Sequence, residues 1–140
     1  MSEKIDSNAA ILELLNQALV IEYTMIIHYP RIASAMPDEH TRKLSQLLGS
    51  ASMAHFDTVT STITKLGGIP NCAFEPFPED LDLKTIFEIQ LDKERKAAQL
   101  HNQIAGLITD FPLREKFKGL VKDEFAHARI VEEILSKLEQ

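Results

Sequence analysis

The chain is poor in the residues that build cysteine-based sites and irregular structure. Its 140 residues include 1 cysteine, 5 glycines and 6 prolines. The single thiol, Cys72, excludes an internal disulfide framework, a thiolate zinc cluster and a CxxC redox pair. No apolar run approaches the roughly 18–20 residues that cross a bilayer, and the first residues lack the basic end and apolar centre of a signal peptide. We therefore expect a soluble, cytoplasmic protein that does not bind a membrane.

Positive charge is also scarce. Lysine and arginine number 15 against 21 aspartates and glutamates, which gives a formal net charge of −6. An acidic chain lacks the basic face that attracts nucleic acid or anionic lipid, so we expect neither as a partner. The length suits one domain with a sizeable core, and we assign residues 1–140 to it.

The glycines and prolines concentrate in two places, at residues 67–78 and around Pro112. Between these breaks, apolar residues recur every three or four positions, which is the helical period. This pattern predicts an all-α protein with helices at roughly 9–35, 38–66, 81–109 and 113–138. The link 69–80 is long enough to cross a bundle from end to end. Pro30 falls inside the first helix and should kink it, or end it near Tyr29, because proline donates no amide hydrogen bond.

Residues with known capping chemistry support these boundaries. Ser7 or Asn8 can cap the first helix, and Asp38 can cap the second, because their side chains accept hydrogen bonds from free amides. Gly67 and Gly68 should stop the second helix, since glycine enters the left-handed conformation without a steric cost.

Each helix carries acidic or imidazole side chains near the middle of its apolar stripe. They are Glu22 in the first helix, His55 in the second, Glu94 in the third, and Glu124 with His127 in the fourth. The last two are three residues apart, hence about 60° apart around the helix axis. A buried, unpaired carboxylate costs several kcal/mol. One such glutamate could be a flank residue that reaches solvent, but the whole set is hard to explain in that way.

A bound cation would make this burial tolerable. Carboxylate oxygens with imidazole nitrogens suit iron or manganese, whereas structural zinc sites usually recruit thiolates. Facing helices of a bundle are where di-iron carboxylate sites are built. The residues therefore predict a metal site between the four helices.

Several segments carry a resemblance to a known family. They are LNQALVIE, which ends at Glu22; Met53-Ala54-His55; LGGIPN at 66–71; Glu94; and DEFAH at 123–127. Over nearly its whole length the chain resembles the ferritin-like superfamily, and within it the bacterioferritin and rubrerythrin-type bundles. The resemblance implies an up-down four-helix bundle with a long crossover between helices two and three. It also implies two iron ions, with Glu22 and Glu94 as terminal ligands, His55 and His127 as imidazole ligands, and Glu124 as the bridge.

The chain departs from the family pattern at one ligand position. Helix two of the family carries Glu-x-x-His, but here the motif reads Ser52-Met53-Ala54-His55. Four carboxylates would neutralise two divalent ions, so the three that are present leave about one positive charge uncompensated. An external anion can fill the gap, a single metal can bind, or the site can be empty. We favour an occupied centre with an open bridging position.

The resemblance implies an oxidoreductase that reacts with dioxygen or peroxide at an iron centre. Manganese or a single metal could replace the two irons, and we do not expect haem. The absence of CxxC pairs excludes a fused rubredoxin module, so a peroxidase would need a separate reductant. Alternatives are bacterioferritin-like iron storage, a non-catalytic bundle with a degenerate site, and an enzyme that oxidises a carboxylate substrate. We expect a homodimer packed through helices one and two, although a larger shell is possible.

Other polar residues are weaker candidates. His101 could be an extra ligand or a donor to one, but we favour a buried, hydrogen-bonded histidine. Asp123 could orient a ligand histidine or be solvated, and the Tyr29 hydroxyl could approach the metals, although core packing is the simpler interpretation. Met53 matches a haem-ligand position, but we favour a core or interface methionine. The remaining features receive no chemistry: His28, His40, Cys72 and the acidic loop 75–82.

Overall fold

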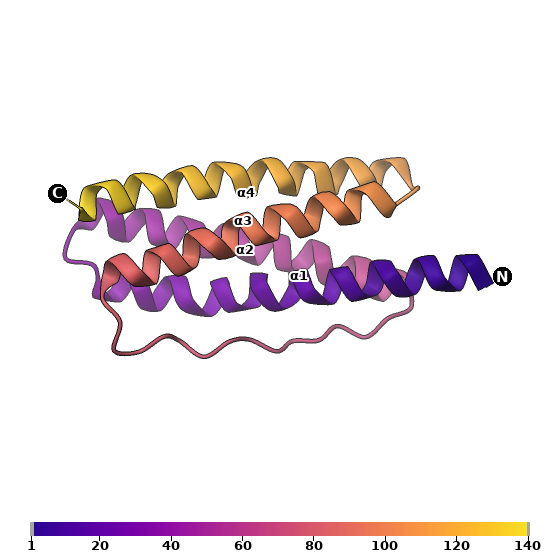
Figure 1. The fold of residues 1–140 in the computed structure, drawn as a ribbon, viewed down its shortest axis with the longest axis horizontal. Coiled ribbons are helices and arrows are strands. Elements are labelled where there is room, and N and C mark those ends of the chain that lie inside the picture. Colours follow the sequence, from indigo (N-terminus) through magenta and orange to yellow (C-terminus); the bar gives the residue numbers. More distant parts are fainter. Residues whose placement is uncertain (1, 140) are drawn as a thin grey trace.

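The computed structural model describes residues 2–139, with side chains from residue 8 onward. Four long helices form an antiparallel pair of hairpins, and the described residues contain no strand (Figure 1). Their bounds are α1 Ser2–Ala35, α2 Glu39–Lys65, α3 Leu83–Leu107 and α4 Phe111–Leu138. α1 packs on α2 and on α3, and α3 packs on α4. The all-α bundle predicted from the sequence is therefore confirmed.

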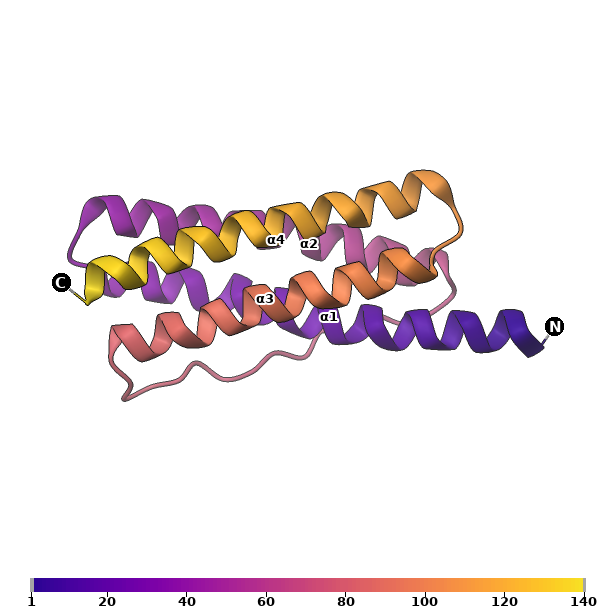
Figure 2. The ribbon, with the colours of Figure 1, turned by 45° about the horizontal axis from the view of Figure 1, so that its top comes forward.

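A long crossover joins the two hairpins. Residues 66–82 run along the outside of the bundle beside α1 from one end to the other, so α2 and α3 point in the same direction (Figures 1 and 2). Glu75 fixes this segment near its middle. Its amide donates to Thr24 Oγ1 at 3.0 Å, its carbonyl accepts from His28 Nε2 at 2.8 Å, and its carboxylate lies 2.5 Å from Lys93 Nζ. The rest of the acidic loop 75–82 is largely exposed.

Most helix boundaries have the predicted chemical causes. Asp38 caps α2 by accepting from the Thr41 amide at 2.8 Å. α2 stops before Gly67, whose φ of +83° lies in the left-handed region that glycine enters freely. Asp110 caps α4 immediately before Phe111 and Pro112.

The predicted N-terminal cap of α1 is wrong, and so is one of the two alternatives predicted at Pro30. The helix begins at Ser2, so Ser7 and Asn8 lie inside it rather than at its cap. The helix also continues through Pro30, so the alternative that it ends near Tyr29 is wrong, and the alternative of a kink stays a prediction. The missing amide removes one hydrogen bond, but the flanking turns remain helical because Tyr29 and Ile32 are buried in the core.

α1 is more apolar than we expected. Its stretch Asn8–Ala35 has a mean hydropathy of 1.5 over 18 residues, which meets the length and composition test for a membrane span. The expectation that no run approaches this length is therefore wrong. A core helix covered by two neighbours meets the same test, and 44% of that window is buried within the bundle. The buried side carries Leu15, Leu19 and Met25, together with the carboxylate of Glu22.

Candidate metal centre

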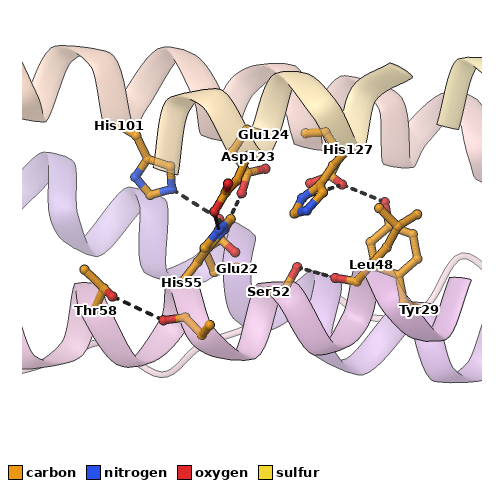
Figure 3. Close-up of polar contacts among 12 residues, drawn as sticks. Glu22, Tyr29, Leu48, Ser52, His55, Thr58, His101, Asp123, Glu124 and His127 are labelled. Carbon is orange, nitrogen blue, oxygen red and sulfur yellow. Dashed lines mark hydrogen bonds and ion pairs between the residues drawn. The ribbon is translucent and has the colours of Figure 1, made fainter. Parts of the chain in front are cut away.

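The five sequence-predicted ligands and His101 meet in the interior of the bundle. Figure 3 labels all of them except Glu94. Glu22 comes from α1, His55 from α2, Glu94 and His101 from α3, and Glu124 with His127 from α4. All six residues are buried, and His127 is the most exposed at 8%. The periodicity of each helix places its polar side chain inward, and the antiparallel packing brings the four helices to a common depth.

Four of these side chains form a first group, which we call cluster A: Glu22, His55, His101 and Glu124. One candidate ligand atom from each residue lies within 4.8 Å of the corresponding atoms of the others. His55 Nδ1 is 2.5 Å from Glu124 Oε1 and 3.5 Å from Glu22 Oε1. His101 Nε2 is 3.2 Å from the same Glu22 oxygen. Two carboxylates and two imidazoles therefore lie close enough together to bind one cation.

A second group, cluster B, contains Glu94, Glu124 and His127. Its candidate ligand atoms also lie within 4.8 Å of one another, and Glu124 belongs to both clusters. His127 Nδ1 is 3.6 Å from Glu94 Oε2, and the Tyr29 hydroxyl donates to that same oxygen at 3.2 Å. Glu124 therefore has the position that a bridging carboxylate requires.

Asp123 holds one imidazole of the centre in place. Its Oδ2 accepts from His55 Nε2 at 3.0 Å, on the side of the ring that faces away from Glu22 and Glu124. A hydrogen on Nε2 leaves the Nδ1 lone pair free, which is the usual arrangement for a histidine that binds a metal. The possibility that Asp123 orients a histidine from another helix is therefore realised, although the carboxylate itself is 57% exposed.

The clusters have the donors of a cation site but few hydrogen bonds. Among the described residues, most buried side-chain atoms that lack a hydrogen-bond partner belong to this centre. They are Glu22 Oε2, His55 Nδ1, Glu94 Oε1, His101 Nδ1, both oxygens of Glu124, and His127 Nδ1. Each such atom ordinarily costs about 1–3 kcal/mol. The close approach of His55 Nδ1 and Glu124 Oε1 does not satisfy hydrogen-bond geometry, and a shared divalent cation would satisfy both lone pairs. The donor set fits iron or manganese.

The pKa values of the centre also show that its buried negative charge lacks a compensating positive charge. Burial and the nearby Glu22 carboxylate raise the pKa of Glu124 from 4.5 to about 7. Burial, together with the Glu124 carboxylate, raises the pKa of Glu94 well above its usual value. Burial alone would lower the pKa of His55, but Glu124 and Glu22 outweigh it and raise the pKa from 6.5 to about 11. His55 therefore acts as the local cation when no metal is bound.

The other two imidazoles stay neutral. Burial and the adjacent His55 lower the pKa of His101 to about 3. Burial and His55 also lower the pKa of His127, to about 4, against the opposing effect of Asp123. Both rings are therefore neutral at neutral pH, and each has one nitrogen that carries a hydrogen and one whose lone pair a metal can accept.

Ser52 occupies the position where the family pattern has a bridging glutamate. It is fully buried, and its hydroxyl donates to the Leu48 carbonyl of its own helix at 3.1 Å. The side chain is thus satisfied locally and supplies no carboxylate to either cluster. The gap in the ligand set that the sequence predicted is present in the structure.

Of the weaker candidates, only His101 belongs to a cluster. His101 is buried and hydrogen-bonded, as we favoured, but it also belongs to cluster A; its spacing of seven residues from Glu94 was the available signal. Met53 is 52% exposed, so a core position is wrong. His28 is buried against the crossover, outside both clusters. His40 and Cys72 are exposed, and Cys72 is unpaired.

Comparisons with known proteins agree with this geometry. A sequence model described as Ferritin-like domain matches residues 12–140. Among solved structures, a Rhodobacter capsulatus bacterioferritin with a metal-free dinuclear site and haem iron is 25% identical, with a TM-score of 0.78 over 94% of this chain and 86% of that one. A Desulfovibrio desulfuricans bacterioferritin with a di-iron site has a TM-score of 0.83 at 23% identity, over 96% of this chain and 82% of that one.

A ferritin-like di-iron-carboxylate protein from Bacillus anthracis is 20% identical, with a TM-score of 0.80 over 92% of this chain and 97% of that one. Likeness at these lower identities establishes the fold alone. No curated protein sequence matches significantly. The family match covers nearly the whole chain, and the bundle carries buried glutamates and histidines that are candidate metal ligands. The chain therefore belongs to the ferritin-like domain family.

Proposed function

We propose that this protein binds iron in the centre formed by clusters A and B and acts as an oxidoreductase toward dioxygen or peroxide. The proposed ligands are Glu22, His55, Glu94, Glu124 and His127, within one domain that spans residues 1–140. The observation that carries the proposal is that Glu124 is fully buried and shared by two groups of ligand atoms. A carboxylate in that position repels its neighbours unless cations lie on both sides of it.

The residues of the chain have distinct tasks in this proposal. Iron(II) held there would supply the electrons that reduce the oxidant. Asp123 keeps the His55 ring oriented, and the Tyr29 hydroxyl holds one oxygen of Glu94. Ser52 leaves the second bridging position without a protein ligand, so this coordination position is available to an external ligand. The buried apolar walls exclude bulk water from the centre.

An iron titration under argon tests the proposal directly. The metal-free protein should bind iron(II), and admission of oxygen or peroxide should then produce an iron-dependent absorbance change and consumption of the oxidant. Glu124→Ala should lower the iron stoichiometry and abolish the reaction. Glu133→Ala, an exposed glutamate on the same helix, is the control and should behave like the wild type. Unchanged iron binding in Glu124→Ala would show that the bridging assignment is wrong. A folded wild-type protein with no iron-dependent signal would instead indicate a non-catalytic bundle.

The assembly distinguishes this function from iron storage. We propose a homodimer through α1 and α2, because Leu47 and Met53 on α2 are 54% and 52% exposed. Gel filtration should give a particle of two chains, and Met53→Asp should shift it toward one. A hollow shell that retains many iron atoms per chain would favour storage. We propose the cytoplasm as the location, since the exposed, unpaired Cys72 suits a reducing compartment.

A further inference from the structure

We propose that His101 is a protein ligand of cluster A that compensates for the carboxylate missing at Ser52, and that the centre therefore consists of two unequal sites. One divalent cation binds tightly in cluster A. A second binds weakly in cluster B and needs a small external anion. The inference rests on the proposed function insofar as the centre must bind metal, but it concerns which residues hold each ion.

The geometry gives His101 the same relation to cluster A as the expected ligands have. Its side chain is fully buried, and its Nε2 lies 3.2 Å from Glu22 Oε1. The ring centre is 6.1 Å from that of His55, and the two planes are nearly perpendicular at 80°. Figure 3 shows His101 extending from α3 toward Glu22, from the side opposite His127. Two imidazoles therefore approach the two carboxylates of cluster A from different helices.

The ligand inventory differs between the clusters. Cluster A has four candidate donors, two of them carboxylates, whereas cluster B has three and shares Glu124 with cluster A. The charges of Glu22 and Glu124 neutralise one divalent cation. Only Glu94 remains for a second cation, so about one positive charge would be buried without a partner, which is strongly unfavourable at low dielectric. An external carboxylate or hydroxide at the position that Ser52 leaves open would remove this charge.

Two hydrogen bonds also make cluster B a weaker cation site than cluster A. One oxygen of Glu94 already accepts a hydrogen bond from Tyr29, so cluster B competes with that bond for its terminal carboxylate. Ser52 cannot assist, because its hydroxyl donates along its own helix to Leu48. No comparable competitor exists for Glu22 among the described residues, since its contacts are His55 and His101, both members of cluster A.

Titration of the metal-free, full-length protein with cobalt(II) tests the proposal. Calorimetry and the visible absorption of bound cobalt give stoichiometry, affinity and coordination without relying on activity. The wild type should bind one cobalt tightly and a second more weakly, and acetate should tighten the second site relative to chloride at the same concentration.

Three variants identify the ligands. His101→Gln retains a donor that can hydrogen-bond to Glu22 but is a poor ligand. It should therefore weaken the tight site by at least the roughly 10–100-fold that loss of an outer-shell partner costs. Ser52→Glu restores the bridging carboxylate and should produce two tight sites that no longer respond to acetate. His28→Gln alters a buried histidine outside both clusters and should leave both affinities unchanged. Thermal unfolding of each metal-free variant confirms that it is folded.

The outcomes distinguish the two proposals. If His101→Gln binds its tight cobalt like the wild type, His101 is a structural histidine and the inference fails while the proposed function stands. Two equally tight sites in the wild type would also overturn the inference. A folded wild type that binds neither cobalt nor iron would overturn the proposed function, and the inference with it. If Ser52→Glu folds but gains no second tight site, the role given to Ser52 is wrong.

Discussion

Replacement of Glu124 by glutamine should stabilise the metal-free protein above neutral pH. The folded-state pKa of Glu124 is raised from 4.5 to about 7, first by burial and then by Glu22. A raised pKa means that the folded state favours the protonated form. Its contribution to stability is fully present below pH 4.5 and is lost as the pH rises through about 7. Above that point, the ionised carboxylate destabilises the fold.

The size of the effect follows from the same numbers. At about 1.4 kcal/mol for each pH unit between the two pKa values, the ionised Glu124 costs about 3 kcal/mol. The free energy of unfolding of metal-free Glu124→Gln should therefore exceed that of the wild type by up to about 3 kcal/mol at pH 8, and by little at pH 4.5. Because the domain is small, this difference corresponds to a rise in Tm of roughly 10 °C at most.

Metal should reverse the order of stability. A ligand present at about 1,000 times its dissociation constant stabilises the folded state by about 4.1 kcal/mol. This exceeds the roughly 3 kcal/mol that the ionised Glu124 costs, and the variant has lost the shared ligand that couples the clusters. Urea unfolding followed by circular dichroism at pH 4.5 and pH 8, with chelator and with iron(II), measures all four states. Glu133→Gln on the same helix is the matched control and should change none of them. A metal-free Glu124→Gln protein that is less stable than the wild type at pH 8 would refute the argument.

Three other perturbations test separate parts of the structure. Asp123→Ala should reduce metal affinity roughly 10–100-fold by calorimetry, because His55 loses the acceptor that orients its ring. Glu75→Ala should lower the free energy of unfolding by about 1–2 kcal/mol, since it leaves the largely buried Lys93 unpaired. By contrast, Glu79→Ala breaks only an exposed pair on the same crossover and should cost between about 0 and 1 kcal/mol. In the metal-free protein, the free energy of unfolding should fall by up to about 1.4 kcal/mol per pH unit as the pH rises from 7 toward 10, because the pKa of His55 is raised to about 11. The Tm should fall with it. His55→Gln should flatten this dependence, and a wild-type Tm that does not change with pH would contradict the assigned charge of His55.

The bundle itself was predictable because its signals are local. The helical period, the cap at Asp38 and the left-handed Gly67 each depend on residues a few positions apart, and the structure has all three. The start of α1 was not predictable in this way. Good capping residues at Ser7 and Asn8 favour a helix start by only about 1 kcal/mol, and the helix extends past them to Ser2.

The sequence predicts which helix faces carry the ligands of the centre, but it does not predict how far one helix is shifted along another. Periodicity places Glu22, Glu94 and Glu124 on buried faces, and the structure brings all three together. Whether His101 touches that group depends on how α3 is shifted along α1, and no pattern within one helix records that shift. Met53 shows the converse limit, because an apolar side chain can lie on the outer face of α2 as well as on the inner one.

Ser52 and His101 together affect both the stability of the metal-free fold and the number of cations that bind tightly. A fourth carboxylate at residue 52 would be buried as Ser52 is, and its ionisation would carry the same desolvation cost that raises the pKa values of Glu94 and Glu124. Serine removes that charge and satisfies its own hydroxyl at Leu48. A neutral imidazole at His101 then adds a donor without adding negative charge. The metal-free fold should therefore be more stable than that of a bundle with four buried carboxylates. The affinity for the second cation should be lower.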